Sequence, residues 1–269
     1  MTQMIPMLLT LMAVGAFAGV LAGLLGVGGG IVLVPAFLWL FTAVGYDSDQ
    51  IMQVCLATSL ATIIVTSARS VLAHHRKGAV DWDILRRWAP GIMVGALAGV
   101  MVVARLRTPT LQMIFGVMVL LIAAYMAFGR KEWRLWDGMP GGITRAVWSA
   151  GIGFLSVLLG IGGGSLAVPT MTLSGVAIHR AVATAAGFGI AIALPSVLAF
   201  LAVPVANAPP YTLGAVNLPA FAVVIAMTLI TAPMGAALAH RTDAARLKRI
   251  FAGFLAIVAL NMLRKVLLG

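Results

Sequence analysis

Long stretches without charge are the feature that most limits what this chain can fold into. Residues 1–46, 146–178 and 181–239 contain no Asp, Glu, Lys or Arg. One membrane-spanning helix needs about 20 consecutive apolar residues, so these stretches are long enough for several crossings. Because only 9% of all residues are charged and 62% are hydrophobic, almost nothing is left for a soluble domain. The sequence therefore predicts a polytopic membrane protein.

The net charge of +11 does not indicate nucleic-acid binding. The 18 Lys and Arg residues cluster in short loops between apolar runs, and such clustering is a membrane topology signal. The single cysteine, Cys55, excludes a disulfide within the chain, a thiolate zinc cage and an iron–sulfur cluster held by this chain alone. The four histidines are too dispersed to suggest a metal site. We therefore expect a lipid environment, no nucleic acid, no metal and no cofactor.

A glycine-rich motif occurs twice. The sequence GVLAGLLGVGGGIVLVP at residues 19–35 returns as GFLSVLLGIGGGSLAVP at residues 153–169. Further matches follow in the same order: LATS at 56–59 with VATA at 182–185, and GAVD at 78–81 with GAVN at 214–217. The chain is therefore a duplication, with a first membrane repeat at 1–134 and a second at 135–269 in one integral membrane domain.

Each repeat is expected to contain an apolar segment, the glycine break, a short apolar segment and three ordinary spans. The predicted segments are 8–26, 31–44, 50–73, 88–105 and 110–128 in the first repeat, and 146–161, 165–178, 181–203, 219–239 and 247–268 in the second.

Loop charges distinguish two topologies. If the helix ran straight through each glycine break, the basic residues would divide ten against seven, with no bias. If the chain turns back at each break, thirteen lie on one side, leaving on the other only Arg105, Arg107, Arg264 and Lys265. Because Lys and Arg in short loops favour the cytoplasm, we predict that the chain turns back and that both termini are extracytoplasmic.

The predicted fold is an all-α polytopic membrane protein of two inverted repeats, each a glycine-broken helical hairpin followed by three transmembrane helices. The repeats are inverted because each contains an odd number of passes. Inverted repeats are typical of alternating-access transporters.

The glycine triplets predict non-helical backbone at membrane depth. Such backbone is tolerated only where protein or a water-filled cavity satisfies its polar groups. Glycine permits a positive φ, and the bare N–H groups at the start of the next helix favour an anion. Helix packing is the alternative, and we prefer it for the glycines spaced four apart: Gly15, Gly19, Gly23, Gly91, Gly95 and Gly99. Packing on one face does not explain three adjacent glycines.

The polar residues of the spans indicate the same chemistry. No Asp or Glu lies within a predicted span, which disfavours a cation substrate. Thr58 and Thr184 occupy equivalent repeat positions, with hydrogen bonding to the preceding helical turn as their alternative role. Arg69 could attract an anion, although snorkelling to the headgroups is the favoured reading. The candidate substrate-binding residues are Gly28, Gly29, Gly30, Thr58, Ser59, Gly162, Gly163, Gly164, Ser165 and Thr184.

These motifs resemble the TauE/SafE family of membrane permeases. The likeness covers nearly the whole chain and rests on GVGGG with Pro35, GIGGG with Pro169, and the Ala-Thr-Ser and Ala-Thr-Ala stretches that follow. It implies a secondary transporter or exporter of sulfite or an organosulfonate in the inner membrane, with its site between the repeats. A thiosulfate-conducting group in the wider superfamily has cysteine-rich motifs, which a chain with Cys55 alone lacks.

Two other classes of function stay open. A passive anion channel is compatible with the sequence. An intramembrane enzyme is disfavoured because no nucleophile with a positioned base stands out in the spans, and no ATP-binding loop is present. The anion, the direction of transport, proton coupling and the oligomeric state are not indicated by the sequence.

Overall fold

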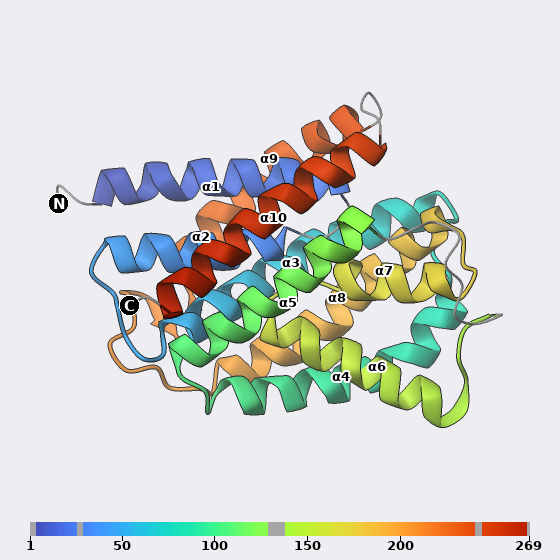
Figure 1. Cartoon of the computed structure of the whole chain (residues 1–269), viewed down its shortest axis with the longest axis horizontal. Helices are drawn as coiled ribbons and strands as arrows, with labels where there is room; N and C mark the ends of the chain where they lie inside the picture. The colour runs from blue at the N-terminus through green and yellow to red at the C-terminus, as the bar shows by residue number, and fades with distance from the viewer. Residues whose placement is uncertain (1–3, 26–28, 129–137, 240–243, 268–269) are drawn as a thin grey trace.

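The computed structural model describes residues 4–25, 29–128, 138–239 and 244–267. The described part is an α-helical bundle with one two-stranded hairpin, and it confirms the predicted all-α polytopic fold (Figure 1). The elements are α1 (Met4–Leu25), α2 (Gly30–Ala43), α3 (Ile51–Arg76), α4 (Trp82–Val103), α5 (Thr108–Phe128), α6 (Gly142–Leu158), α7 (Gly164–Leu173), α8 (Ile178–Phe200), β1 (Thr212–Leu213), β2 (Val216–Asn217), α9 (Leu218–Ala239) and α10 (Ala244–Leu267).

The two largest differences from the predicted helix boundaries, at the start of α4 and the end of α7, have local reasons. Helix α4 begins at Trp82 rather than near 88, because the Asp81 carboxylate accepts the backbone N–H of Ile84 at 3.1 Å and caps the helix. Helix α7 ends at Leu173 rather than near 178, because Gly175 turns the chain with a φ of +82°.

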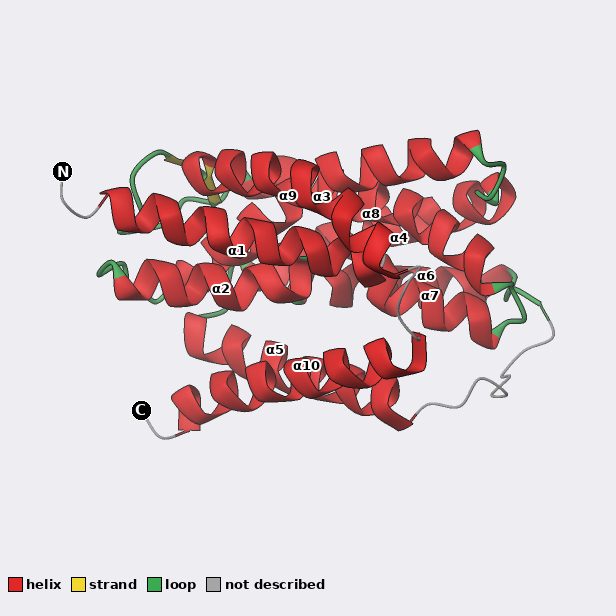
Figure 2. Cartoon of the chain, turned by 90° about the horizontal axis from the view of Figure 1, so that it is seen from above, coloured by secondary structure: helices red, strands yellow, loops and turns green. Residues whose placement is uncertain are grey.

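The chain turns back at both glycine segments. Helices α1 and α2 run in opposite directions, as do α6 and α7 (Figure 1). Helix α1 begins and helix α10 ends at the same end of the bundle. The α3–α4 connection lies at the opposite end from the β1–β2 hairpin (Figures 1 and 2).

Helices α3 and α8 form the centre of the bundle. Of their most apolar windows, 78% and 67% of residues are buried, against 39% or less for α4, α5 and α9. Around them α1 packs on α9, α4 on α6 and α5 on α10, so each of these pairs joins a helix before residue 129 to one after it. The α5–α10 pair lies along one side of the bundle (Figure 2).

The outer surface of the helices is apolar. Within the described residues, α3, α4, α5, α8 and residues 218–235 of α9 are long and apolar enough to cross a membrane. Large side chains such as Val94, Leu198 and Ile230 are more than 60% exposed on these helices. Exposed apolar surface is stable against lipid tails, so the chain is an integral membrane protein.

Glycines on α4 allow close packing against α6. A Cβ added to Gly95 would lie 2.6 Å from the carbonyl carbon of Ala150, and one added to Gly99 would lie 3.0 Å from the carbonyl oxygen of Phe154. A Cβ added to Gly91 would likewise contact the Ser149 side chain. Cβ atoms added to Gly15 and Gly19 would contact residues of α9. These contacts confirm the packing role for the five glycines, while the surroundings of Gly23 lie outside the described part.

We expect Gly95→Ala to lower the free energy of unfolding by about 1–3 kcal/mol, because the new methyl group overpacks the α4–α6 contact. Gly151→Ala on α6 is the matched control, since a Cβ there meets no atom within 4 Å. Thermal unfolding of the purified proteins measures both changes. Equal losses in the two variants would contradict the assigned packing.

Candidate functional site

The first glycine segment bends the chain into α2. Gly29 precedes the helix with a φ of +70°, a left-handed conformation that favours glycine. Its carbonyl accepts the N–H groups of Val32 at 3.0 Å and Leu33 at 3.1 Å. Gly30 is buried, and Gly28 lies outside the described residues.

The second glycine segment connects α6 to α7. Gly160 has a φ of +58°, and the N–H of Ile161 returns to the carbonyl of Ser156 at 2.9 Å. Gly163 precedes α7, and its carbonyl accepts the N–H of Ala167 at 2.8 Å. Glycine has no side chain to cap the helix, so the first N–H groups of α7 remain available to a ligand.

The two segments meet against α3. A Cβ on Gly30 would overlap the carbonyl oxygen of Gly160 and lie 3.0 Å from the Cα of Ile161. The Ile63 side chain of α3 lies 3.2 Å from that added Cβ and 3.3 Å from one added to Gly162. We call this meeting point of residues 29–30 and 160–164 the glycine crossing.

Ser59 connects α3 to the glycine crossing. Its hydroxyl donates to the carbonyl of Gly160 at 2.8 Å, and its side chain is fully buried. Gly160 lies beyond the end of α6, and the Ser59 hydroxyl supplies a hydrogen bond to its carbonyl. Sequence reasoning selected Ser59 but missed Gly160, although the repeat pairs Gly160 with Gly26.

Thr58 and Thr184 make reciprocal contacts across the chain. The Thr58 hydroxyl oxygen accepts the N–H of Asn217 at 3.0 Å, and that of Thr184 accepts the N–H of Asp81 at 2.9 Å. Both threonines are fully buried. Neither donates to the preceding helical turn in the described structure, so each hydroxyl hydrogen is available. The GAVD and GAVN echo could have identified Asp81 and Asn217 in advance.

Four buried side-chain atoms in the described part of the chain have no hydrogen-bond partner. They are Ser48 Oγ, Gln53 Oε1, Ser156 Oγ and Ser165 Oγ. Ser156 lies four residues before Gly160, and Ser165 lies in the first turn of α7, so both flank the second glycine segment. Buried polar groups are nearly always paired, and an unpaired one indicates a water, an ion or a ligand. Ser156 was not predicted, and its equivalent in the first repeat is Ala22.

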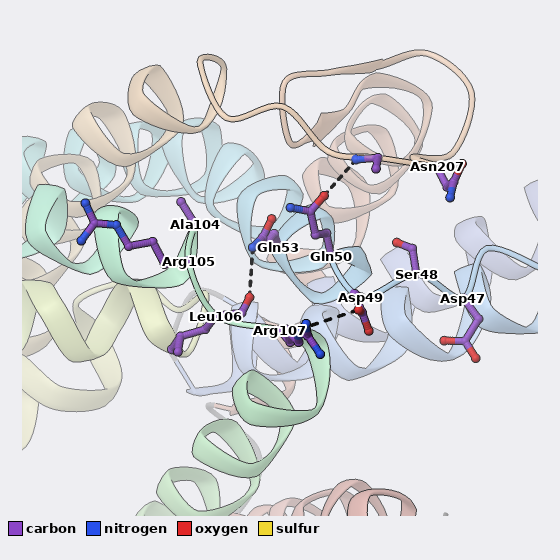
Figure 3. A pocket seen from close by; sticks show the side chains of 11 residues that line it. Asp47, Ser48, Asp49, Gln50, Gln53, Ala104, Arg105, Leu106, Arg107 and Asn207 are labelled. Carbon is purple, nitrogen blue, oxygen red and sulfur yellow. Dashed lines mark hydrogen bonds and ion pairs between the residues drawn. The ribbon is translucent and has the colours of Figure 1, made fainter.

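The other two unpaired atoms belong to an outer pocket (Figure 3). This cavity of about 650 Å³ is formed by the α2–α3, α4–α5 and α8–β1 connections. Gln53 is 1% exposed, and its Nε2 donates to the carbonyls of Val103 at 2.9 Å and Leu106 at 3.1 Å. Its Oε1 is left without a donor. The pocket is lined by Asp47, Ser48, Asp49, Gln50, Gln53, Ala104, Arg105, Leu106, Arg107, Ala206 and Asn207.

Arg69 is not at the glycine crossing. It is exposed on α3, ten residues beyond Ser59, which corresponds to about 15 Å along the helix. Snorkelling of Arg69 to the lipid headgroups stays a prediction. Across the described ranges, no group of three or more His, Cys, Asp or Glu side chains could hold a metal ion.

The glycine crossing offers neutral hydrogen-bond donors. These are the first N–H groups of α7. The hydroxyls of Ser156 and Ser165, on either side of the second glycine segment, are further neutral donors. The acidic residues of the described part of the chain, Asp47, Asp49, Asp81 and Asp83, lie in loops or in the first turn of α4. Donors at a helix N-terminus without a nearby carboxylate suit a small anion.

The chain is similar to known membrane transporter proteins. The model of the family "Sulfite exporter TauE/SafE" matches residues 11–262. A probable membrane transporter protein of Haemophilus influenzae is 33% identical over 97% of this chain and 100% of its own length. The probable membrane transporter proteins YunE of Bacillus subtilis and MJ0441 of Methanocaldococcus jannaschii are 32% and 25% identical, over 61% and 94% of this chain and 66% and 94% of theirs. No solved structure matches the chain.

The family match covers almost the whole chain, and the relatives share both its length and its membrane character. The chain therefore belongs to the sulfite exporter TauE/SafE family of membrane transporters.

Proposed function

We propose that this protein is a secondary transporter of a small sulfur-containing oxyanion, sulfite or a short organosulfonate, which binds at the glycine crossing. The observation that carries the proposal is the pair of unpartnered buried hydroxyls that flank the second glycine segment, Ser156 on α6 and Ser165 in the first turn of α7, together with the absence of a side-chain cap on α7. An oxyanion has several oxygens, each of which can accept a hydrogen bond from such N–H and O–H groups. The name of the family, sulfite exporter TauE/SafE, supports sulfur oxyanions as the substrate class.

The closed packing of the glycine crossing supports a carrier rather than an open channel. Gly30 lies against Gly160, and Phe188 Cβ would be 2.7 Å from a Cβ on Gly163. An anion could pass only if these contacts separated. In this proposal, the repeats 1–134 and 135–269 are inverted and move against each other to expose the site to one side at a time. Their boundary lies outside the described residues.

The outer pocket would be the vestibule on one side of the site. Its buried residue Gln53 precedes Ser59 by six residues on α3, a rise of about 9 Å. The vestibule and the glycine crossing would then be consecutive polar positions along one helix. This order accounts for all four unpartnered buried atoms of the described structure.

We expect sulfite to raise the melting temperature of the purified protein, because a ligand that binds only the folded state stabilises it. Chloride at equal ionic strength should stabilise less, since a single ion lacks several acceptor oxygens. Sodium and potassium are compared with a common anion. Stabilisation by the cations alone would contradict the proposal.

We expect Ser156→Ala and Ser165→Ala to weaken sulfite binding by about tenfold each while leaving stability unchanged, because neither hydroxyl has a partner in the folded protein. Ser196→Ala is the matched control, since that buried hydroxyl donates to the Ile192 carbonyl at 2.7 Å. It should affect stability and not affinity. If all three variants behave alike in binding and unfolding, the two serines are not ligands.

The inverted arrangement predicts that cysteines at Lys77 and Tyr211 react with an impermeant reagent from opposite sides of the membrane. Both positions are exposed, and the native Cys55 is buried and should stay silent. Gly214 is unsuitable for labelling, because a Cβ there would lie 2.5 Å from the Phe200 carbonyl oxygen. Labelling of both positions from the same side would rule out inverted repeats.

A further inference from the structure

The two residues that the threonines hold differ in charge, because Thr184 contacts Asp81 and Thr58 contacts Asn217. At one end of the bundle the Asp81 carboxylate accepts from Ile84 N–H through Oδ1 and pairs with Arg180 through Oδ2 at 3.1 Å. At the other end Asn217 Oδ1 accepts from Ala220 N–H at 3.0 Å. Both residues cap the next helix, but only Asp81 also forms an ion pair, with Arg180.

The repeat shows that Arg180 has no charged counterpart. Arg180 precedes Thr184 by four residues on α8, and the residue four before Thr58 on α3 is the fully buried Val54. The amide nitrogen of Asn217 instead donates to Pro210 O at 3.1 Å and Thr212 Oγ1 at 3.0 Å. An ionic contact beside the threonine is therefore particular to the Asp81 end.

The Arg180–Asp81 pair is accessible to an anion from solution. The Arg180 side chain is 57% exposed and that of Asp81 21% exposed, and they meet through one Nη2–Oδ2 contact. A guanidinium has five N–H donors, so most of those of Arg180 are left for another acceptor. Carboxylates and sulfur oxyanions both suit the same planar fork of donors.

Arg180 lies close to the contact that holds the start of α4 against α8. It is one helical turn, about 6 Å, from Thr184, which holds the backbone N–H of Asp81. An anion that displaces the Asp81 carboxylate from Arg180 would remove one of the two polar contacts that join Asp81, at the start of α4, to α8.

We propose that Arg180 is the first contact of the transported anion at this end, and that the Asp81 carboxylate occupies the guanidinium while this end is closed. This proposal rests on the anion-transport function and adds a residue outside the glycine crossing. Asp81 competes with the substrate, so its charge sets the apparent affinity at this end.

The test compares sulfite titrations of the full-length purified protein, read as melting temperature. Asp81→Asn keeps a capping oxygen, as Asn217 does, and should lower the half-saturating sulfite concentration about two- to fivefold, in the range expected for a partly exposed pair. Arg180→Val introduces the residue found at the equivalent position 54. It should raise the half-saturating sulfite concentration by at least the same factor. The double variant should match Arg180→Val.

Asp83→Asn is the control, because it removes the same charge two residues away and breaks only the exposed Arg87–Asp83 pair of 3.0 Å. Equal effects of Asp81→Asn and Asp83→Asn would show a general charge effect and overturn the proposal, as would wild-type affinity in Arg180→Val. If Asp81→Asn does not fold, Arg180→Val decides alone. Absence of any sulfite effect on the wild-type protein would instead refute the transport function itself.

Discussion

The structure depends on how two breaks in helical backbone are satisfied at membrane depth. Lipid offers no hydrogen bonds, so a chain that leaves the helix inside a bilayer must find partners within the protein. Here each break packs against the other, with Gly30 on Gly160, and α3 supplies the Ser59 hydroxyl to the Gly160 carbonyl. Any side chain at Gly30 would separate the segments. The glycines are therefore needed for the close approach as well as for the turns.

The parts of the chain before and after residue 129, which correspond to the two predicted halves, also interlock. Helices α3 and α8 sit at the centre, and Thr58 and Thr184 on them hold the starts of α9 and α4 from the opposite half. Every one of the outer pairs α1–α9, α4–α6 and α5–α10 also crosses between halves. Relative motion of the halves would then act on both ends of the glycine crossing, which is the property an alternating-access carrier needs.

The charge-free stretches predicted the polytopic all-α fold, and the duplicated glycine motif predicted the breaks before α2 and α7. The inverted arrangement that the loop charges favour stays a prediction. The start of α4 was missed, since the Asp81 cap is a local contact that hydropathy does not contain. For the site, the glycines could be chosen from the repeat, and Ser59 from its place beside the repeated threonine Thr58. Ser156 was missed, because what marks it is the absence of a hydrogen-bond partner, which only coordinates reveal.

We propose that a small oxyanion passes between the halves by alternate exposure of one site. Counterflow in proteoliposomes tests it most directly. Vesicles loaded with unlabelled sulfite should take up external labelled sulfite faster than empty vesicles, because an occupied carrier returns its site to the outside with each exchange. An uptake rate that does not depend on internal sulfite would identify a channel, and no sulfite flux above that of protein-free vesicles would contradict the account.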